Sequence, residues 1–142
     1  MKLIFSLLIL MFSNLVWSDI YVVTNINNPI ESLTQKDVRD FYLGRRKSFS
    51  GSDFTVILDR SPDSELRAEF FFTLTGMQLR QVDAFWARLV FAGRMLPLKT
   101  VESNEDLLAM VAGEVNSIGY TKTRPNPKKV KTLLVIRAED KQ

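Results

Sequence analysis

The chain of 142 residues contains no cysteine and no histidine. Without cysteine there is no disulfide framework, no thiolate nucleophile and no residue for lipoprotein anchoring. Without histidine, the Ser-His and Cys-His pairs of hydrolytic enzymes and the histidine-containing metal sites are excluded. No run of Asp, Asn and Gly has the spacing of a calcium-binding loop either. We therefore expect a protein that is not an enzyme and that carries no cofactor and no metal.

The chain also has no large excess of positive or negative charge. Nineteen Lys and Arg residues stand against sixteen Asp and Glu residues, which gives a formal net charge of +3. So weak a bias does not indicate a nucleic-acid partner. The one run of three adjacent cations, Arg45-Arg46-Lys47, opens a loop rich in serine and glycine. It is interpreted as a solvated turn or, alternatively, as a basic lip beside an anion site.

The long apolar run of this sequence stands at its N-terminus. Lys2 precedes an almost unbroken apolar run from Leu3 to Phe12, and Val16-Trp17-Ser18 ends in a small residue. This pattern is typical of a secretory signal peptide, here residues 1–18. The run is short for a bilayer span of about 20 residues, so an uncleaved anchor is the less favoured alternative. We expect a periplasmic or secreted protein, with no stable membrane anchor after cleavage and a single domain over residues 19–142.

The rest of the chain alternates between strand-like and helix-like patterns. Runs of β-branched and aromatic residues predict strands at 20–24, 54–58 and 130–136, with 117–120 as a short strand or turn. Apolar residues at helical spacing predict helices at 35–43 and 77–91, a helix that contains 65–74, and another from 102 that ends at Gly113. Thr34 and Asp37 resemble a capping box ahead of the first helix. The order strand, helix, strand predicts parallel pairing of the first two strands.

The stretch Asp59 to Arg67 joins the second strand to the following helix. Ser61 is predicted as the helix N-cap and Pro62 as the first helical residue. Asp63 and Glu65 then lie in the first turn, where the helix dipole is positive.

This junction is also the candidate site. A strand that opens into a helix N-terminus is where α/β proteins place anions and small ligands, and Arg60 and Arg67 flank this one. The alternative is a well-capped core helix whose arginines pair with Asp63 and Glu65.

Several short motifs stand in one order along the chain. They are Asn28-Pro29-Ile30, Ser32-Leu33-Thr34, Phe41-Tyr42-Leu43-Gly44-Arg45-Arg46, the stretch Asp59 to Arg67 with Phe70, Phe85-Trp86, Phe91-Ala92-Gly93 and Ser117-Ile118-Gly119-Tyr120. Together they resemble the phosphate-binding periplasmic protein family, the substrate-binding component of phosphate ABC importers. More narrowly, the chain is similar to the short single-lobe members of that family. The resemblance extends from Ile20 to Ile136.

The resemblance implies an α/β fold, a single lobe of a type-II periplasmic binding protein with a mixed, mostly parallel sheet flanked by helices. In full-length members two lobes close over the ligand, and a Ser-Gly-Thr turn at a helix N-terminus donates to phosphate. The matching turn here runs from Asp63 to Arg67, and Ser64 and Arg67 carry over. Glu65 and Leu66 stand at the glycine and threonine positions, which removes a hydroxyl and adds a carboxylate.

Two hypotheses follow. The first is a binding module for phosphate or a related oxyanion, with an altered, weakened site formed by Arg60, Ser61, Ser64 and Arg67. Micromolar affinity needs about 8 kcal/mol, whereas an exposed helix N-terminus contributes about 0.3–1 kcal/mol. We therefore expect weak or absent binding of free phosphate unless a homodimer or another protein supplies the missing lobe. The second hypothesis is a non-transport accessory or protein-interaction domain that kept the lobe but lost ligand binding.

Overall fold

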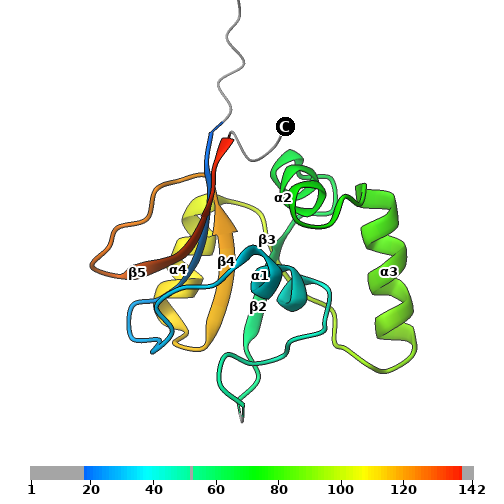
Figure 1. Cartoon of the computed structure of the whole chain (residues 1–142), viewed down its shortest axis with the longest axis horizontal. Helices are drawn as coiled ribbons and strands as arrows, with labels where there is room; N and C mark the ends of the chain where they lie inside the picture. Colours follow the sequence, from blue (N-terminus) through cyan, green and yellow to red (C-terminus); the bar gives the residue numbers. More distant parts are fainter. Residues whose placement is uncertain (1–17, 52, 139–142) are drawn as a thin grey trace, which may run out of the picture.

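A five-stranded sheet with helices on both faces forms the centre of the protein (Figure 1). The computed structural model describes residues 18–51 and 53–138. The elements are β1 (Ile20–Asn25), α1 (Gln35–Tyr42), β2 (Val56–Arg60), α2 (Glu65–Thr75), α3 (Leu79–Phe91), β3 (Lys99–Val101), α4 (Asn104–Gly113), β4 (Ser117–Thr121) and β5 (Val130–Ile136). Among the helices described, none is long and apolar enough to cross a membrane. The predicted signal peptide lies outside the described residues, apart from Ser18.

The strand order across the sheet is β3-β2-β4-β1-β5. β2 pairs in parallel with β3 and β4, whereas β1 pairs in antiparallel fashion with β4 and β5. Four strands therefore point one way and β1 points the other way, which confirms the predicted mixed, mostly parallel sheet. The predicted parallel pairing of the first two strands is wrong, because β4 lies between β1 and β2. Sequence patterns mark a strand, but they do not identify its neighbours.

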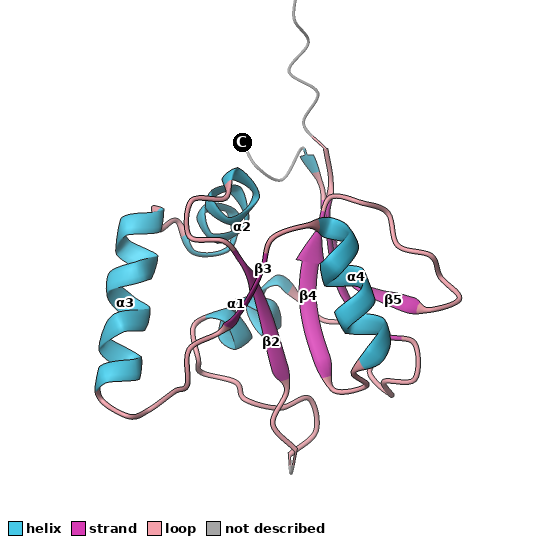
Figure 2. Ribbon diagram, turned by 180° about the vertical axis from the view of Figure 1, so that it is seen from behind, coloured by secondary structure: helices cyan, strands magenta, loops and turns pink. Residues whose placement is uncertain are grey.

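The helices divide between the two faces of the sheet. α4 packs on β4 and β1, while α2 contacts α1, α3 and β2. Figure 1 shows α4 behind β4, and Figure 2, seen from behind, shows it in front. Side chains along each strand alternate accordingly. Val22 and Ile57 belong to the larger core under α1 and α2, and Val23 and Leu58 belong to the smaller core under α4.

Most of the predicted elements are confirmed. The capping box of α1 is present, because Thr34 Oγ1 accepts a hydrogen bond from the amide of Asp37 and the Asp37 carboxylate accepts one from the amide of Thr34. Residues 117–120 belong to a strand rather than a turn. β3 was not predicted, since Lys99-Thr100-Val101 is short and begins with two exposed polar residues. Its strand conformation depends on pairing with β2.

β2 begins and ends two residues later than predicted, and so includes Asp59 and Arg60. Charged residues at a strand end favour a loop when only the sequence is considered. Both side chains are nevertheless buried, because the neighbouring elements provide their hydrogen-bond partners.

Candidate functional site

A cleft of about 510 Å³ lies at the carboxyl ends of the three parallel strands β2, β3 and β4. Arg60 ends β2, Glu102 follows β3, and Lys122 and Thr123 follow β4. The N-terminal ends of two helices complete the lining, with Leu66 from α2 and Ser103, Asn104 and Glu105 from α4. This edge of an α/β sheet is where ligands commonly bind, because helix N-termini and strand ends converge there.

The N-terminus of α2 differs from the prediction. The helix begins at Glu65, and its N-cap is Ser64, whose Oγ accepts a hydrogen bond from the amide of Arg67 at 3.2 Å. Ser61 is therefore not the cap, and Pro62 and Asp63 lie in a turn before the helix. In that turn the amide of Ser64 donates to the carbonyl of Ser61 at 2.9 Å. The fixed φ of proline suits such a turn as well as the first position of a helix. The sequence alone therefore does not decide which of the two Pro62 occupies.

Arg67 points to two aspartates. Its Nε lies 2.9 Å from Oδ2 of Asp59, and its Nη1 lies 2.9 Å from Oδ1 of Asp83. The predicted alternative, in which this arginine pairs with Asp63 or Glu65, is therefore wrong about the partners. Burial lowers the pKa of Arg67, but the two carboxylates outweigh burial and raise that pKa above its ordinary value. The charge of this arginine is balanced within the fold.

Arg60 is buried as well, yet its hydrogen-bond partners are neutral. Nε and Nη2 donate to the carbonyl of Tyr120 at 3.3 and 3.1 Å, and Nη2 also donates to Oδ1 of Asn104. Nη1 donates to the carbonyl of Glu102 at 3.5 Å, which is a long hydrogen bond. Burial lowers the pKa of Arg60, although a guanidinium still carries its charge at neutral pH. The guanidinium that lines the cleft thus donates its hydrogen bonds to neutral oxygens, and the nearby Asp59 charge opposes the effect of burial on its pKa.

A buried network holds this arginine in place. Oδ1 of Asp59 accepts hydrogen bonds from the hydroxyl of Tyr120 at 2.6 Å and from the amide of Arg60 at 2.8 Å. The ring of Phe70 stacks on Tyr120 with centroids 3.7 Å apart. Burial raises the pKa of Tyr120 well above its ordinary value, and the Asp59 carboxylate raises it further. The network joins β2, α2 and β4 directly behind the cleft.

The remaining charges of the cleft are mixed. The ammonium of Lys122 lies 2.8 Å from a carboxylate oxygen of Glu69, which partly neutralises its charge. Glu102 and Glu105 line the cleft and are exposed. At α4, Ser103 Oγ accepts a hydrogen bond from the amide of Asp106 at 3.0 Å. Within the described part of the chain, no group of acidic residues is arranged to hold a metal ion.

The four predicted site residues have different positions in this geometry. Arg60 lines the cleft, Ser64 caps the helix beside it, Ser61 lies in the turn that leads to that helix, and Arg67 points to the aspartates. Asn104 and Lys122 were not predicted as site residues. The sequence showed that a helix opens near Asn104, but its place beside α2 depends on the pairing of β3 with β2.

Comparison with known proteins gives support at the level of the fold. No protein-family model matches the sequence, and no curated protein matches it. Several solved structures resemble the fold, among them two phosphate-transport proteins. An ABC-type phosphate transport receptor from Vibrio cholerae has a TM-score of 0.63 at 16% identity, over 82% of this chain and 47% of that protein. A protein from Clostridium perfringens assigned as a phosphate ABC transporter substrate-binding protein, with bound phosphate, has a TM-score of 0.65 at 19% identity, over 82% of this chain and 45% of that protein.

The described chain therefore spans less than half the length of either structure. At this level of identity the likeness shows the fold alone. It confirms the predicted α/β architecture, which matches one lobe of the phosphate-binding protein fold.

Proposed function

We propose that this protein is a periplasmic or secreted binding module for phosphate or a related oxyanion, and that the anion binds in the cleft at the carboxyl ends of β2, β3 and β4. The fold shared with two phosphate receptors supports the proposal, and one of those structures contains phosphate. The signal-peptide pattern of residues 1–18 supports export. The module binds its ligand and carries out no reaction.

One observation carries the proposal, namely that the two buried arginines differ in their partners. Two carboxylates contact Arg67, whereas the direct partners of Arg60 are neutral oxygens. Arg60 is therefore the cation of the cleft lining that makes no direct ion pair with a described residue, whereas Lys122 pairs with Glu69. A guanidinium presents its N–H groups in a planar fork that suits phosphate oxygens. The long hydrogen bond from Nη1 to Glu102 is the one that a ligand would most easily replace.

The other predicted residues have supporting roles in this proposal. Ser61 and Ser64 precede the first turn of α2, where backbone N–H groups and the helix dipole favour an anion. Arg67 acts as a positioning residue, because its contact with Asp59 fixes the start of α2 against the end of β2. Arg60 would thus face the ligand from the cleft lining, Ser61 and Ser64 would act from beside the cleft at the start of α2, and Arg67 would hold them in place.

The expected affinity of this cleft alone is weak. A helix N-terminus contributes up to about 2 kcal/mol when partly buried, whereas a millimolar dissociation constant already needs about 4 kcal/mol. A carboxylate about 4 Å from the anion, as Glu102 or Glu105 would be if it turned inward, costs about 1–4 kcal/mol. We expect a millimolar dissociation constant for the chain alone, and tighter binding where a second copy or a partner protein closes the cleft.

The same carboxylates favour the second candidate function, an accessory or protein-interaction domain outside transport that has lost its ligand. Glu102 and Glu105 line the cleft, and Glu69 already pairs with Lys122. In this case the cleft would bind no free anion.

Nuclear magnetic resonance distinguishes the two functions. Inorganic phosphate is titrated into the ¹⁵N-labelled protein at constant ionic strength, with chloride as the reference and sulfate as a second oxyanion. We expect saturable shifts of the backbone amides at 64–66 and 104–106. Arg60→Gln should abolish these shifts, whereas Arg124→Gln, which removes an exposed cation outside the cleft lining, should preserve them.

Shifts that chloride reproduces, or that survive in Arg60→Gln, would contradict the proposed site. No saturable shift with either oxyanion would favour the accessory domain. The remainder of each spectrum reports whether the variant is folded.

A further inference from the structure

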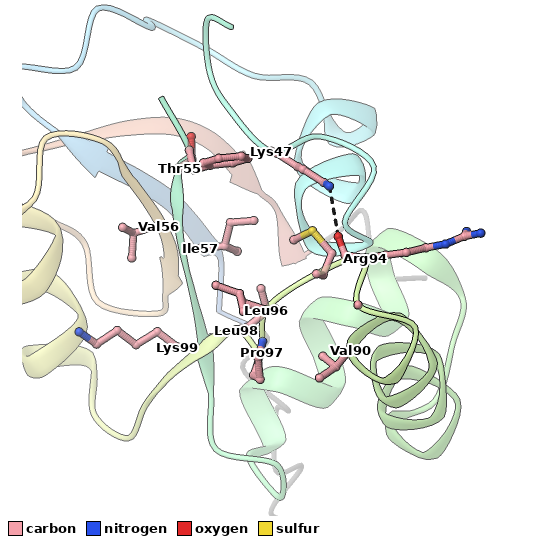
Figure 3. A pocket seen from close by; sticks show the side chains of 13 residues that line it. Lys47, Thr55, Val56, Ile57, Val90, Arg94, Leu96, Pro97, Leu98 and Lys99 are labelled. Atoms are coloured by element: carbon pink, nitrogen blue, oxygen red, sulfur yellow. Dashed lines mark hydrogen bonds between the residues drawn. The ribbon is translucent and has the colours of Figure 1, made fainter. Parts of the chain in front are cut away.

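A second cavity, of about 460 Å³, lies at the opposite ends of β2 and β3 from the cleft. The first residues of β2 and the loop that follows α3 form it. Lys47, from the loop that begins with Arg45-Arg46-Lys47, completes the lining. Figure 3 shows Ile57, Leu96 and Leu98 gathered between β2 and α3, with Val90 facing them from α3. This volume falls within the usual range of binding pockets, about 300–1,000 Å³. We name it the apolar pocket.

Large apolar side chains at this pocket are exposed to solvent. Phe54 is 77% exposed and Leu96 is 83% exposed, and both belong to the lining. A single exposed apolar residue on a protein surface is ordinary, but several around one cavity mark a binding surface. An occupant that only fills the cavity would leave the outer parts of these side chains in water. A larger partner would cover them.

The charged residues that line the apolar pocket are all basic. Lys47, Arg94 and Lys99 are among its thirteen lining residues, and none of the thirteen is acidic. The ammonium of Lys47 donates to the carbonyl of Arg94 at 3.2 Å. In Figure 3 the side chains of Arg94 and Lys99 extend away from the cavity on opposite sides. A small molecule inside the cavity would not reach both charges, whereas a polypeptide that crosses the mouth would.

We propose that the apolar pocket docks an acidic segment of a partner protein. One aromatic or branched aliphatic side chain of that segment fills the cavity, and carboxylates on either side of it meet Arg94 and Lys99. A buried apolar anchor supplies most of the affinity of such an interface, while the surrounding charges select the partner and speed its association. This site does not depend on the proposed anion cleft, because Arg60 lies at the other end of β2.

The first step of the test is a selection. A displayed library of random twelve-residue peptides is selected on the purified protein, and binders of the variant Leu96→Asp are removed. We expect the enriched peptides to share one large apolar residue flanked by Asp or Glu. A fluorescein-labelled synthetic copy of the strongest peptide is then titrated by fluorescence polarisation.

The second step compares variants at exposed positions, where a substitution should leave the fold intact. Leu96→Asp and the double variant Arg94→Glu with Lys99→Glu should each raise the dissociation constant at least tenfold. Phe91→Ser changes a residue that is 97% exposed and outside the lining, and should change the dissociation constant less than twofold. The double variant Lys128→Glu with Lys129→Glu, also outside the lining, controls for net charge.

Several results would overturn the proposal. The proposal fails if the selection enriches no peptide, or if the enriched peptides lack acidic residues. It also fails if Leu96→Asp binds the peptide as tightly as the wild type does. If anilinonaphthalene sulfonate binds at this pocket while no peptide does, the pocket takes small amphipathic anions instead. Displacement of the peptide by inorganic phosphate would place the peptide in the cleft and would also contradict the proposal.

Discussion

Nε of Arg67 lies 2.9 Å from Oδ2 of Asp59, and the two side chains are 7% and 6% exposed. Arg67 belongs to the first turns of α2, and Asp59 belongs to the end of β2. The other oxygen of the same carboxylate accepts a hydrogen bond from Tyr120 of β4. One aspartate therefore joins three elements at the edge of the sheet where the cleft opens.

Removal of this carboxylate should strongly destabilise the fold. In Asp59→Asn, the buried Arg67 loses a charged partner, and Asp83, its other carboxylate contact in the described structure, is half exposed. Loss of one member of a buried ion pair costs about 3–5 kcal/mol, because the other charge stays buried and poorly compensated. Urea unfolding followed by circular dichroism measures the change in the free energy of unfolding. Asp83→Asn is the matched control and should cost less than about 1 kcal/mol. Equal costs for the two variants would contradict this assignment.

Stability should fall steeply at alkaline pH. Burial, and then the Asp59 charge, raise the pKa values of Tyr42 and Tyr120 well above their ordinary value in the folded state. Below a pH of about 10 both tyrosines are protonated in the folded and unfolded states, so their contribution is fully present. Above it the unfolded chain loses these protons first, and each tyrosine lowers the free energy of unfolding by up to about 1.4 kcal/mol per pH unit.

Tyr120→Phe tests this pH dependence. Its free energy of unfolding, measured in urea between pH 8 and pH 11, should decline less steeply above pH 10 than that of the wild type. The difference in slope should approach about 1.4 kcal/mol per pH unit. The comparison uses slopes because the variant also loses the hydrogen bond to Asp59 at every pH. Parallel curves would exclude Tyr120 as a titrating group.

The two serines before α2 should differ in their effect on stability. Ser64→Ala removes the side chain that accepts from the amide of Arg67, and the loss of an N-cap costs typically about 1 kcal/mol. Ser61 contributes its carbonyl to the turn, and alanine retains that carbonyl. Ser61→Ala should therefore change the free energy of unfolding by less than about 0.5 kcal/mol. If urea unfolding showed a larger loss of stability for Ser61→Ala than for Ser64→Ala, Ser61 would be the cap and this assignment would be wrong.

A side chain at Gly119 should strain the packing of Leu107 against the sheet. A Cβ atom at this position of β4 would lie 3.0 Å from Cδ1 and 3.2 Å from Cδ2 of Leu107, which packs on the sheet from α4. Overpacking of this kind costs typically about 1–3 kcal/mol, so Gly119→Ala should lower the melting temperature. Gly113, at the end of α4, has no atom within 4 Å of such a Cβ. Gly113→Ala should be neutral or stabilising by up to about 1 kcal/mol, since alanine favours a helix. A similar loss of stability in both variants would show that the Leu107 contact is not responsible.

Features that depend on neighbouring residues were predictable from the sequence. The capping box at Thr34 and Asp37 forms within one helical turn, and β1 and β5 follow from runs of β-branched residues. The N-cap of α2 was harder, because Ser61 and Ser64 both suit an N-cap and Pro62 fits two conformations. Local chemistry limited the choice to a few residues without selecting one.

Partners distant in the sequence were not predictable. Arg67 and Asp83 lie on different helices, and the Tyr120 carbonyl that accepts from Arg60 belongs to a strand 60 residues later. β3 is a strand only because β2 pairs with it. Each of these contacts depends on strand order, which a hydrophobic pattern does not encode.

The sequence by itself determined the α/β alternation, most of the helices and strands, and the polar strand-to-helix junction with two arginines beside it. These follow from propensities and caps that act over a few residues. The tertiary structure alone decided that β1 reverses direction between β4 and β5 and that two helix N-termini share one cleft. It also decided that Arg67 is balanced by carboxylates whereas Arg60 contacts neutral oxygens. The physical reason is that the environment of a buried charge is set by the groups that folding brings against it, and these come from every part of the chain.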